Sequence, residues 1–374
     1  MFLISVVVTK TMFKEIGGNF WLEREVSEDG IPSDLLLTNF PENENVVYSS
    51  TGRGALSLIL RNINIPKKRV LIPSYICESV IKSFECHNYD IDFYEIDLDL
   101  TIDIDTFSRL VEEFDSGIIF LSSYYGLDTL KNLRSKFCSF KNRGIIIIED
   151  LTHLFFGDTG ISQADYRIAS LRKWLPLPDG GVAISKNKAF KICSHQVHHS
   201  FVDMNLKAMR AKREYVKYLD IKLKNEYRSL YAASENVLDF ENDFHEMSKI
   251  SRLILNETDF LSMRKSRRNN YRHLDEFLKT ISWLRPVFDF LPENVVPLFF
   301  PVYISRKRDD VQKYLIENEI YSPIHWPVPT HLRSKMTEKT SYIYNNILSL
   351  PCDQRYSDPE MDRICHVLKE FNNV

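Results

Sequence analysis

Short β-rich hydrophobic runs alternate with stretches of helical periodicity from about residue 46 onward. The four isoleucines at 145–148 make a run that is hydrophobic at every position, as is typical of a strand covered on both faces. This order predicts an α/β fold with a parallel or mostly parallel sheet. The predicted strands are 69–72, 91–96, 118–122, 145–148 and 182–185, and the predicted helices are 52–62, 76–87, 104–114 and 130–141.

The remainder of the chain predicts a second unit. Residues 205–282 contain neither Pro nor Gly and predict long charged helices, which bridge two subdomains or pack against another subunit. A smaller α/β unit follows, with β structure at 295–304 and helices at 309–319 and 359–371, the last with Pro359 in its first turn. A chain of 374 residues is long for one core. We therefore expect an N-terminal arm (1–45), a large domain (46–204), interdomain or dimer helices (205–282) and a small C-terminal domain (283–374).

Composition and charge narrow the function classes. The chain is 44% hydrophobic and 26% charged, with a formal net charge of -3. These values are typical of a soluble globular protein and give no reason to expect a nucleic-acid partner. The basic run at 264–268 is interpreted as a solvated helix face. The six cysteines are scattered without short paired spacings, which argues against a zinc ribbon or other metal site and favours reduced thiols in the cytoplasm.

The N-terminal residues 1–8 are apolar but lack a basic leader and are too short to cross a bilayer. We expect no export signal and no membrane partner. Met12 is a second possible translation start.

Polar residues follow directly after several predicted strands. Pro73-Ser74-Tyr75, Ser123-Tyr124-Tyr125-Gly126 and Asp150-Leu151-Thr152-His153 all occupy such positions. Ligands of parallel sheets bind beyond the carboxyl ends of the strands, so we expect these segments to converge on one site.

Lys173 is the principal catalytic candidate. It lies in Ser170-Leu171-Arg172-Lys173-Trp174, upstream of Asp179-Gly180-Gly181, and the isoleucine strand before it delivers Glu149-Asp150. Many enzymes hold pyridoxal phosphate (PLP) in this way, with the lysine as Schiff-base nucleophile and the aspartate keeping the pyridine nitrogen protonated. A lone Ser-x-x-Lys is more often a surface turn, so the hypothesis depends on the other motifs.

The other cofactor candidates each have a structural alternative. Gly52 and Arg53 begin a helix whose free N–H groups suit a phosphate, although Ser/Thr-Gly is also a common helix cap. Ser170 is a further donor for the phosphate. Asp150, at the end of an apolar strand, needs a cationic partner or local amide bonds. His153 lies against the cofactor ring or is a core histidine.

Together these motifs resemble the fold-type I PLP enzymes, and more narrowly the DegT/DnrJ-like sugar-nucleotide aminotransferases. The resemblance covers residues 46–371 and rests on the order Thr-Gly-x-x-Ala-Leu, Pro-Ser-Tyr, Tyr-Gly, Glu-Asp-x-x-His, Lys and acidic-Gly-Gly. In the C-terminal part, Arg308-Asp309, the segment from Ile320 to Pro327 and Leu348-Ser349-Leu350-Pro351 are similar to that family's signatures. The resemblance implies a PLP-bound homodimer with active sites near the subunit boundary. It also places His325 and Trp326 on the substrate side of the cofactor.

The chain departs from that family at three places. The serine commonly found five residues before the lysine is Ile168 here, and Ser170 stands three before it. The stretch Phe244-His245-Glu246 lacks the Asn-x-Arg pair that contacts the partner subunit. Cys77 occupies the place of the aromatic residue that stacks on the cofactor ring, for which Tyr75 is the substitute we consider.

The resemblance implies an aminotransferase that moves an amino group, usually from glutamate, to a keto sugar nucleotide for surface polysaccharide or a glycoside. The alternatives are an aminotransferase of a non-sugar ketone, a PLP-dependent dehydratase, and a catalytically silent regulator or scaffold. Retention of Lys173 argues against the dehydratases that replace this lysine by histidine, and retention of both Lys173 and Asp150 argues against a silent protein.

Overall fold

The computed structural model describes residues 14–27, 30–31, 44–157, 163–186, 188–239, 243–305 and 307–371. The segment 1–8 and Met12, to which the expectations about export and translation start refer, lie outside these residues. In the described part, the large sheet has the strand order β2-β8-β7-β6-β5-β3-β4. Its strands are β2 (Asn45–Ser49), β3 (Arg69–Pro73), β4 (Asp90–Tyr94), β5 (Ile118–Ser122), β6 (Ile146–Asp150), β7 (Tyr166–Ser170) and β8 (Gly181–Ser185).

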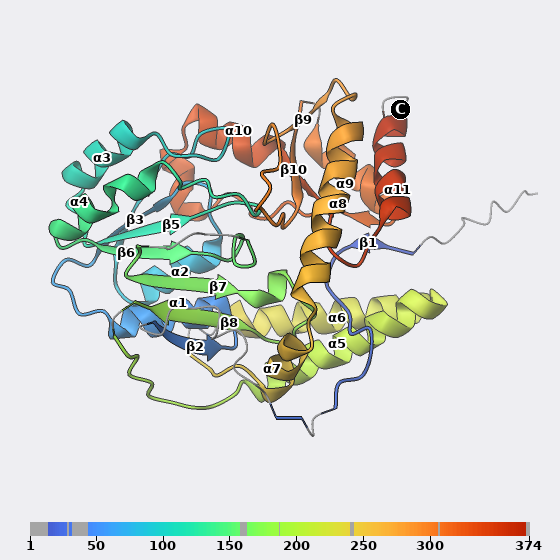
Figure 1. Cartoon of the computed structure of the whole chain (residues 1–374), viewed down its shortest axis with the longest axis horizontal. Helices are drawn as coiled ribbons and strands as arrows, with labels where there is room; N and C mark the ends of the chain where they lie inside the picture. Colours follow the sequence, from blue (N-terminus) through green and yellow to red (C-terminus); the bar gives the residue numbers. More distant parts are fainter. Residues whose placement is uncertain are drawn as a thin grey trace, which may run out of the picture.

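Strands β7, β6, β5, β3 and β4 run parallel, and β8 is antiparallel to both β7 and β2. The prediction of a mostly parallel sheet is therefore confirmed. Alternate residues of the central strands enter two different cores. Ile118 and Phe120 pack with α1 (Gly52–Asn62) and α2 (Glu78–Cys86), while Ile119 and Leu121 pack with α3 (Ile104–Glu113) and α4 (Phe137–Asn142). Helices thus cover both faces of the sheet, as Figure 1 shows.

The second unit is built on an antiparallel sheet with the order β12-β10-β9. Its strands are β9 (Leu284–Pro286), β10 (Phe300–Ile304) and β12 (Ile347–Leu350). Around it lie α8 (Phe260–Leu278), α9 (Arg308–Glu317), α10 (Glu338–Asn346) and α11 (Asp358–Glu370). The N-terminal strand β1 (Ile16–Gly17) pairs in parallel with β11 (Ile320–Tyr321), so the start of the described chain packs on this unit.

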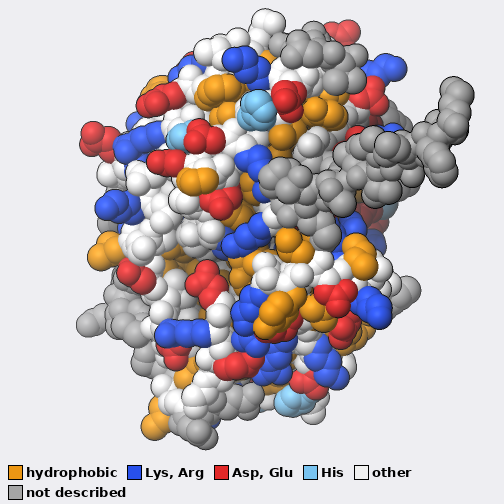
Figure 2. All heavy atoms as spheres, turned by 90° about the vertical axis from the view of Figure 1, so that its right-hand side faces the viewer, with side chains coloured by type: hydrophobic (Ala, Val, Ile, Leu, Met, Phe, Trp, Pro, Cys, Tyr) orange, Lys and Arg blue, Asp and Glu red, His pale blue; other side chains and the backbone are white. Residues whose placement is uncertain are grey.

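A helical hairpin extends away from the large sheet (Figure 1). It consists of α5 (His199–Tyr218) and α6 (Ile221–Asp239), and α7 (Lys249–Asn256) leads from it toward α8. The turn of the hairpin exposes Tyr218 and Ile221. On the face that includes the free end of this hairpin, basic and acidic side chains are interspersed with small groups of hydrophobic ones (Figure 2).

Three sequence predictions differ from the structure. The predicted helix at 130–141 is a 3-10 helix (Leu133–Lys136) followed by α4, and Arg134 within it binds Asp128 and Glu149. The β structure expected over 295–304 is a strand only from Phe300, because Pro297 lacks the N–H that a ladder requires. The basic run at 264–268 is not wholly solvated: Arg267 is 0% exposed because it lies on the face of α8 that packs inward.

Among the described helices, none has the length and apolar character needed to cross a membrane.

Candidate active site

Asp150 and Lys173 meet because their strands are parallel neighbours. Asp150 is the last residue of β6, and Lys173 ends the 3-10 turn (Leu171–Lys173) that follows β7. Both line a cavity of about 230 Å³ beyond the carboxyl ends of the strands. Of the residues predicted for cofactor or substrate binding, Gly52, Arg53, His153, Ser170 and Trp326 also line this cavity. The expected convergence is found in part: residues after β5 and β6 (Ser123, Thr152 and His153) line the cavity, whereas Pro73, Ser74 and Tyr75 after β3 do not.

The Asp150 carboxylate is held by Thr152. The Thr152 amide donates to Oδ1 at 2.8 Å, and the side chain of Thr152 also interacts with the carboxyl group. Burial nevertheless raises the pKa of Asp150 above its ordinary value, against the lowering effects of Thr152 and of the charge on Lys173. A buried carboxylate of this kind is stabilised by a cation placed in the cavity.

His153 connects the Tyr125 backbone to Lys173. The Tyr125 amide donates to His153 Nδ1 at 3.3 Å, and His153 Nε2 lies 3.3 Å from Lys173 Nζ. Burial, followed by the charges on Lys173 and His325, lowers the pKa of His153 well below its ordinary value, so the ring is neutral near pH 7. Since Nδ1 is an acceptor, the neutral ring carries its proton on Nε2 and presents it to the lysine amine.

The Tyr-Gly motif sets this geometry. Tyr125 has a left-handed backbone with φ 57°, and Gly126 follows with φ 100°. A Cβ at Gly126 would lie 2.1 Å from the Val296 carbonyl oxygen, so only glycine fits there. The turn directs the Tyr125 amide toward His153 instead of along the sheet.

The N-terminus of α1 forms part of the cavity wall. The Thr51 hydroxyl accepts from the Gly54 amide at 2.9 Å, and Gly52 and Arg53 begin the helix on the cavity wall. Helix N-termini carry backbone N–H groups without helical partners and favour anions. Strand β8 can approach this helix start closely because its first residue, Gly181, has no Cβ. A Cβ there would lie 2.3 Å from the Thr51 carbonyl carbon.

The aspartate of the acidic-Gly-Gly motif has a structural role. Asp179 is 0% exposed and accepts hydrogen bonds from the Ser248 amide and from the hydroxyls of Ser248 and Ser251 at the start of α7. The Gly180 amide donates to the Ser50 carbonyl at 2.6 Å. The motif therefore joins α7 and the loop before α1 to the sheet.

One aromatic side chain of the second unit, Trp326, lies beside Lys173. The Trp326 ring stacks on His153 with a centroid separation of 5.6 Å and lies 5.6 Å from Lys173 Nζ. Tyr75 packs edge-on against Trp326 at 4.6 Å and lines neither of the cavities that contain Lys173. Its hydroxyl lies 3.0 Å from that of Tyr125 in the core. The structure thus places Trp326, and not Tyr75, beside the lysine.

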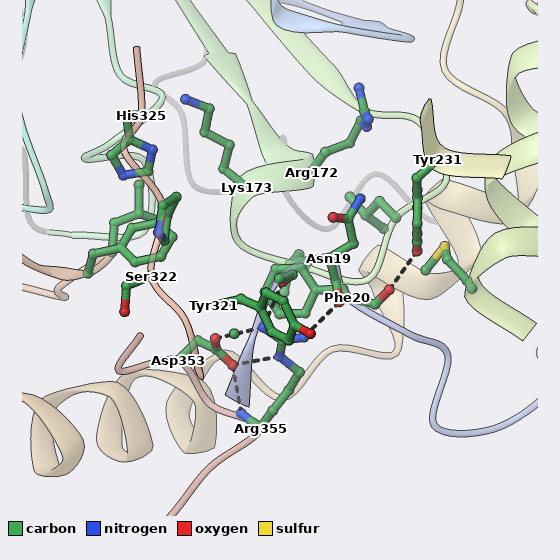
Figure 3. A pocket seen from close by; sticks show the side chains of 18 of the residues that line it. Asn19, Phe20, Arg172, Lys173, Tyr231, Tyr321, Ser322, His325, Asp353 and Arg355 are labelled. Atoms are coloured by element: carbon green, nitrogen blue, oxygen red, sulfur yellow. Dashed lines mark hydrogen bonds and ion pairs between the residues drawn. The ribbon is translucent and has the colours of Figure 1, made fainter. Parts of the chain in front are cut away.

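A second cavity of about 420 Å³ adjoins the first, and Arg172 and Lys173 line both. Figure 3 shows Lys173 and His325 on one side of it, with Asn19 and Tyr321 below them and Arg172 and Tyr231 opposite. His325 Nε2 is buried without a hydrogen-bond partner in the described part of the chain. Burial, followed by the charge on Lys173, lowers the pKa of His325 well below its ordinary value.

The hairpin supplies a wall that the sequence did not reveal. Glu235 of α6 pairs with Arg172, and Arg53 donates to the Leu238 carbonyl. Tyr231 lines the larger cavity, and Glu235 and Leu238 line the smaller one. These contacts join residues far apart in the chain, and no local motif marks them.

The seven-stranded sheet, the second unit and the position of Lys173 after β7 define the fold of the PLP-dependent aminotransferases of fold type I. The chain matches Helicobacter pylori PseC, an aminotransferase involved in the biosynthesis of pseudoaminic acid, with a TM-score of 0.64 and 13% identity over 90% of this chain and 89% of that one. It matches the PLP form of the putative sugar aminotransferase Spr1654 from Streptococcus pneumoniae with a TM-score of 0.62 and 17% identity over 90% and 88%.

A DegT DnrJ EryC1 StrS aminotransferase from Brucella abortus gives a TM-score of 0.60 and 17% identity over 90% and 88%. No family model and no curated protein sequence matches the chain. The resemblance noted from the sequence motifs is thus confirmed as a shared fold.

Proposed function

We propose that this chain is a PLP-dependent aminotransferase that moves an amino group from glutamate to a keto sugar carried by a nucleotide. One observation carries the proposal: Lys173 lies where two cavities meet, with Asp150 and the N-terminus of α1 in the smaller one. The fold shared with sugar aminotransferases supports the same reaction class.

The smaller cavity fits the polar ends of PLP. Asp150 offers a buried carboxylate to a protonated ring nitrogen, and the start of α1 at Gly52 and Arg53 offers N–H groups to a phosphate. Ser170 adds a hydroxyl beside Gly52, since a Cβ at Gly52 would lie 3.2 Å from the Ser170 Cβ. When bound, PLP supplies an electron sink that lets a carbon next to an amine lose its proton.

The residues of the chain then have distinct roles. With PLP bound, the Lys173 amine would be the group that holds the cofactor covalently, and Lys173 Nζ would be placed to move a proton. His153 Nε2–H, fixed by the Tyr125 amide, orients that amine. Asp150 keeps the ring nitrogen protonated. Trp326, which is 8% exposed, shields the lysine from water.

We propose a cytoplasmic homodimer that acts in the biosynthesis of surface polysaccharide or a glycoside. The sequence resemblance supports this assignment, and the involvement of PseC in the biosynthesis of pseudoaminic acid supports the biosynthetic role.

Absorption spectroscopy of the purified chain tests the reaction class. PLP should give a visible band, borohydride reduction should fix the cofactor to Lys173, and L-glutamate should convert the band to that of the pyridoxamine form. A keto sugar nucleotide should then restore it. Attachment to another lysine, or no response to any amino donor, would refute the proposal. Restoration by simple keto acids but by no keto sugar would favour the non-sugar alternative.

A further inference from the structure

The last turns of α6 bind two of the cations that line the smaller cavity. The Glu235 carboxylate pairs with Arg172, and the Leu238 carbonyl, one turn further along α6, accepts a hydrogen bond from Arg53. All four residues line that cavity. Arg53 belongs to the first turn of α1, and Arg172 directly precedes Lys173 in the turn after β7. The end of α6 is therefore attached to the two arginines of the cavity wall.

Glu235 lies where the cavity favours negative charge. The charge on Arg172 is the main cause that holds the pKa of Glu235 below its ordinary value. Burial opposes that effect, and the charges on Arg53 and Lys173 add to it. Figure 3 shows the charged ends of Arg172 and Lys173 extending to the same side of the turn that carries them. The carboxylate is thus attracted by every arginine and lysine of the described residues that line this cavity.

A phosphate group would bring a second anion to the same cations. A phosphate monoester carries about −1.5 to −2 charges at neutral pH, and the N-terminus of α1 at Arg53 is a favourable place for it. Arg53 and Arg172 together offer two positive charges, which one phosphate dianion balances. With the phosphate in place, the Glu235 carboxylate is a surplus negative charge that repels it.

Glu235 can leave this position easily. Its side chain is 54% exposed, so it lies at the mouth of the cavity and can turn toward water. An ion pair with that exposure contributes little to stability. Hydrogen bonds from a guanidinium to phosphate oxygens are stronger, because they are charge-assisted and can be bidentate. A phosphate group can therefore replace the carboxylate on Arg172.

We propose that Glu235 is a self-inhibitory counter-ion, which holds Arg172 until a phosphate group enters the smaller cavity and displaces it. The inference rests on the proposed function, which makes PLP the carrier of that phosphate. Glu235 weakens phosphate binding below what Arg53, Arg172 and the start of α1 would otherwise give. A ligand without a phosphate does not compete with the carboxylate, so the device favours the phosphorylated form of the cofactor.

Inorganic phosphate is the first probe, because it binds without any cofactor chemistry. It is titrated by calorimetry at fixed ionic strength into the full-length chain prepared without cofactor. Glu235→Gln should bind phosphate at least about fivefold more tightly than the unaltered chain, since the competing exposed ion pair is lost. Equal or weaker binding by the variant overturns the inference, because Glu235 then does not compete with the phosphate or orients Arg172 for it. Absence of phosphate binding in the variant overturns it as well.

Glu226→Gln is the matched control. It makes the same change of charge on the same helix, at an exposed position that lines neither cavity. The phosphate affinity should stay within about twofold of that of the unaltered chain. A gain equal to that of Glu235→Gln would show an effect of net charge alone and would refute the role of Glu235. Melting curves check that both variants fold.

The second test compares PLP with pyridoxal, which lacks the phosphate. Absorbance should show that Glu235→Gln captures PLP faster than the unaltered chain does and captures pyridoxal at an unchanged rate. Equal acceleration of both compounds would contradict the inference. A crystal structure of the PLP-loaded chain should place the Glu235 carboxylate beyond ion-pair distance of Arg172, and an intact pair beside the bound phosphate refutes the displacement. Failure of every form of the chain to capture PLP refutes the proposed function instead, and the phosphate titration still decides the role of Glu235.

Discussion

Lys173 Nζ lies 3.3 Å from His153 Nε2, and the opposite nitrogen of the same ring accepts the Tyr125 amide. The backbone amide can only donate, so the neutral imidazole can only donate toward the lysine. This bond forms when the amine has a lone pair to offer, which is the nucleophilic state. The positive φ of Tyr125 is the backbone cost of this arrangement.

His153→Leu should slow the capture of PLP by about fivefold, because one hydrogen bond contributes roughly 1 kcal/mol. The rate is measured by rapid-mixing absorbance. His87→Leu is the control, since His87 is partly buried and hydrogen-bonded to the Ser83 carbonyl but lines neither cavity. Equal rates in both variants would show that His153 does not orient the lysine.

Lys173→Ala should abolish both the covalent attachment of PLP and transamination while leaving the melting temperature close to that of the unaltered chain. The side chain lines both cavities and belongs to none of the hydrophobic clusters of the described residues. Mass spectrometry after borohydride reduction checks the attachment. A pyridoxyl group on any other lysine of the unaltered chain contradicts the assignment.

Asp150→Asn should still bind PLP but lose activity by about a hundredfold or more. A neutral amide does not hold the proton on the ring nitrogen, and loss of a charge that stabilises a transition state costs several kcal/mol. Steady-state turnover and the absorption spectrum are compared in one preparation. Turnover near that of the unaltered chain would contradict the role of Asp150.

The sequence predicted the fold well where local patterns determine it. The strand 118–122 and helix 52–62 were placed at the observed bounds, because a continuous apolar run and the Thr51 cap are local signals. The sequence also predicted that Asp150, His153 and Lys173 lie near one another, because each follows or ends a strand of a parallel sheet. All three line one cavity in the structure.

The unpredicted features depend on tertiary contacts. Arg267 belongs to a run of basic residues in which Arg264 and Lys265 are exposed and Arg268 is half-buried, and nothing within that run indicates which member turns inward. Tyr75 follows a strand, as expected of a cofactor residue. It nevertheless packs against Trp326 of the second unit, and Trp326 is the aromatic residue that lies beside Lys173. Glu235 reaches Arg172 only because α6 folds back over the sheet.

Acidification should destabilise the fold through His153 and His325. Burial lowers both folded-state pKa values well below the ordinary 6.5, so the unfolded chain binds more protons as pH falls below about 6.5. Their contribution is complete above that pH and is lost as pH falls toward the folded-state values. Each histidine lowers the free energy of unfolding by up to about 1.4 kcal/mol for every pH unit of acidification in that range.

Urea unfolding from pH 8 to pH 5 measures this effect. The double variant His153→Leu, His325→Leu should show a flatter dependence than the unaltered chain. The raised pKa of Asp150 changes the stability with the opposite sign, but Asp150 is present in both proteins, so its contribution cancels in the comparison. Parallel curves would mean that the two rings are not the groups that titrate.

His325→Ala should lower substrate turnover by about tenfold without altering the spectrum of the bound cofactor. The ring lines the larger cavity, where its buried Nε2 has no partner among the described residues, and it packs 5.4 Å from His153 and 4.8 Å from Phe299. An unpaired polar atom at that wall is available to a substrate hydroxyl or carbonyl group. His331→Ala is the control, because His331 pairs with Glu85 outside both cavities. A changed spectrum would show that His325 acts on the cofactor instead, and unchanged turnover in His325→Ala would remove it from the substrate site.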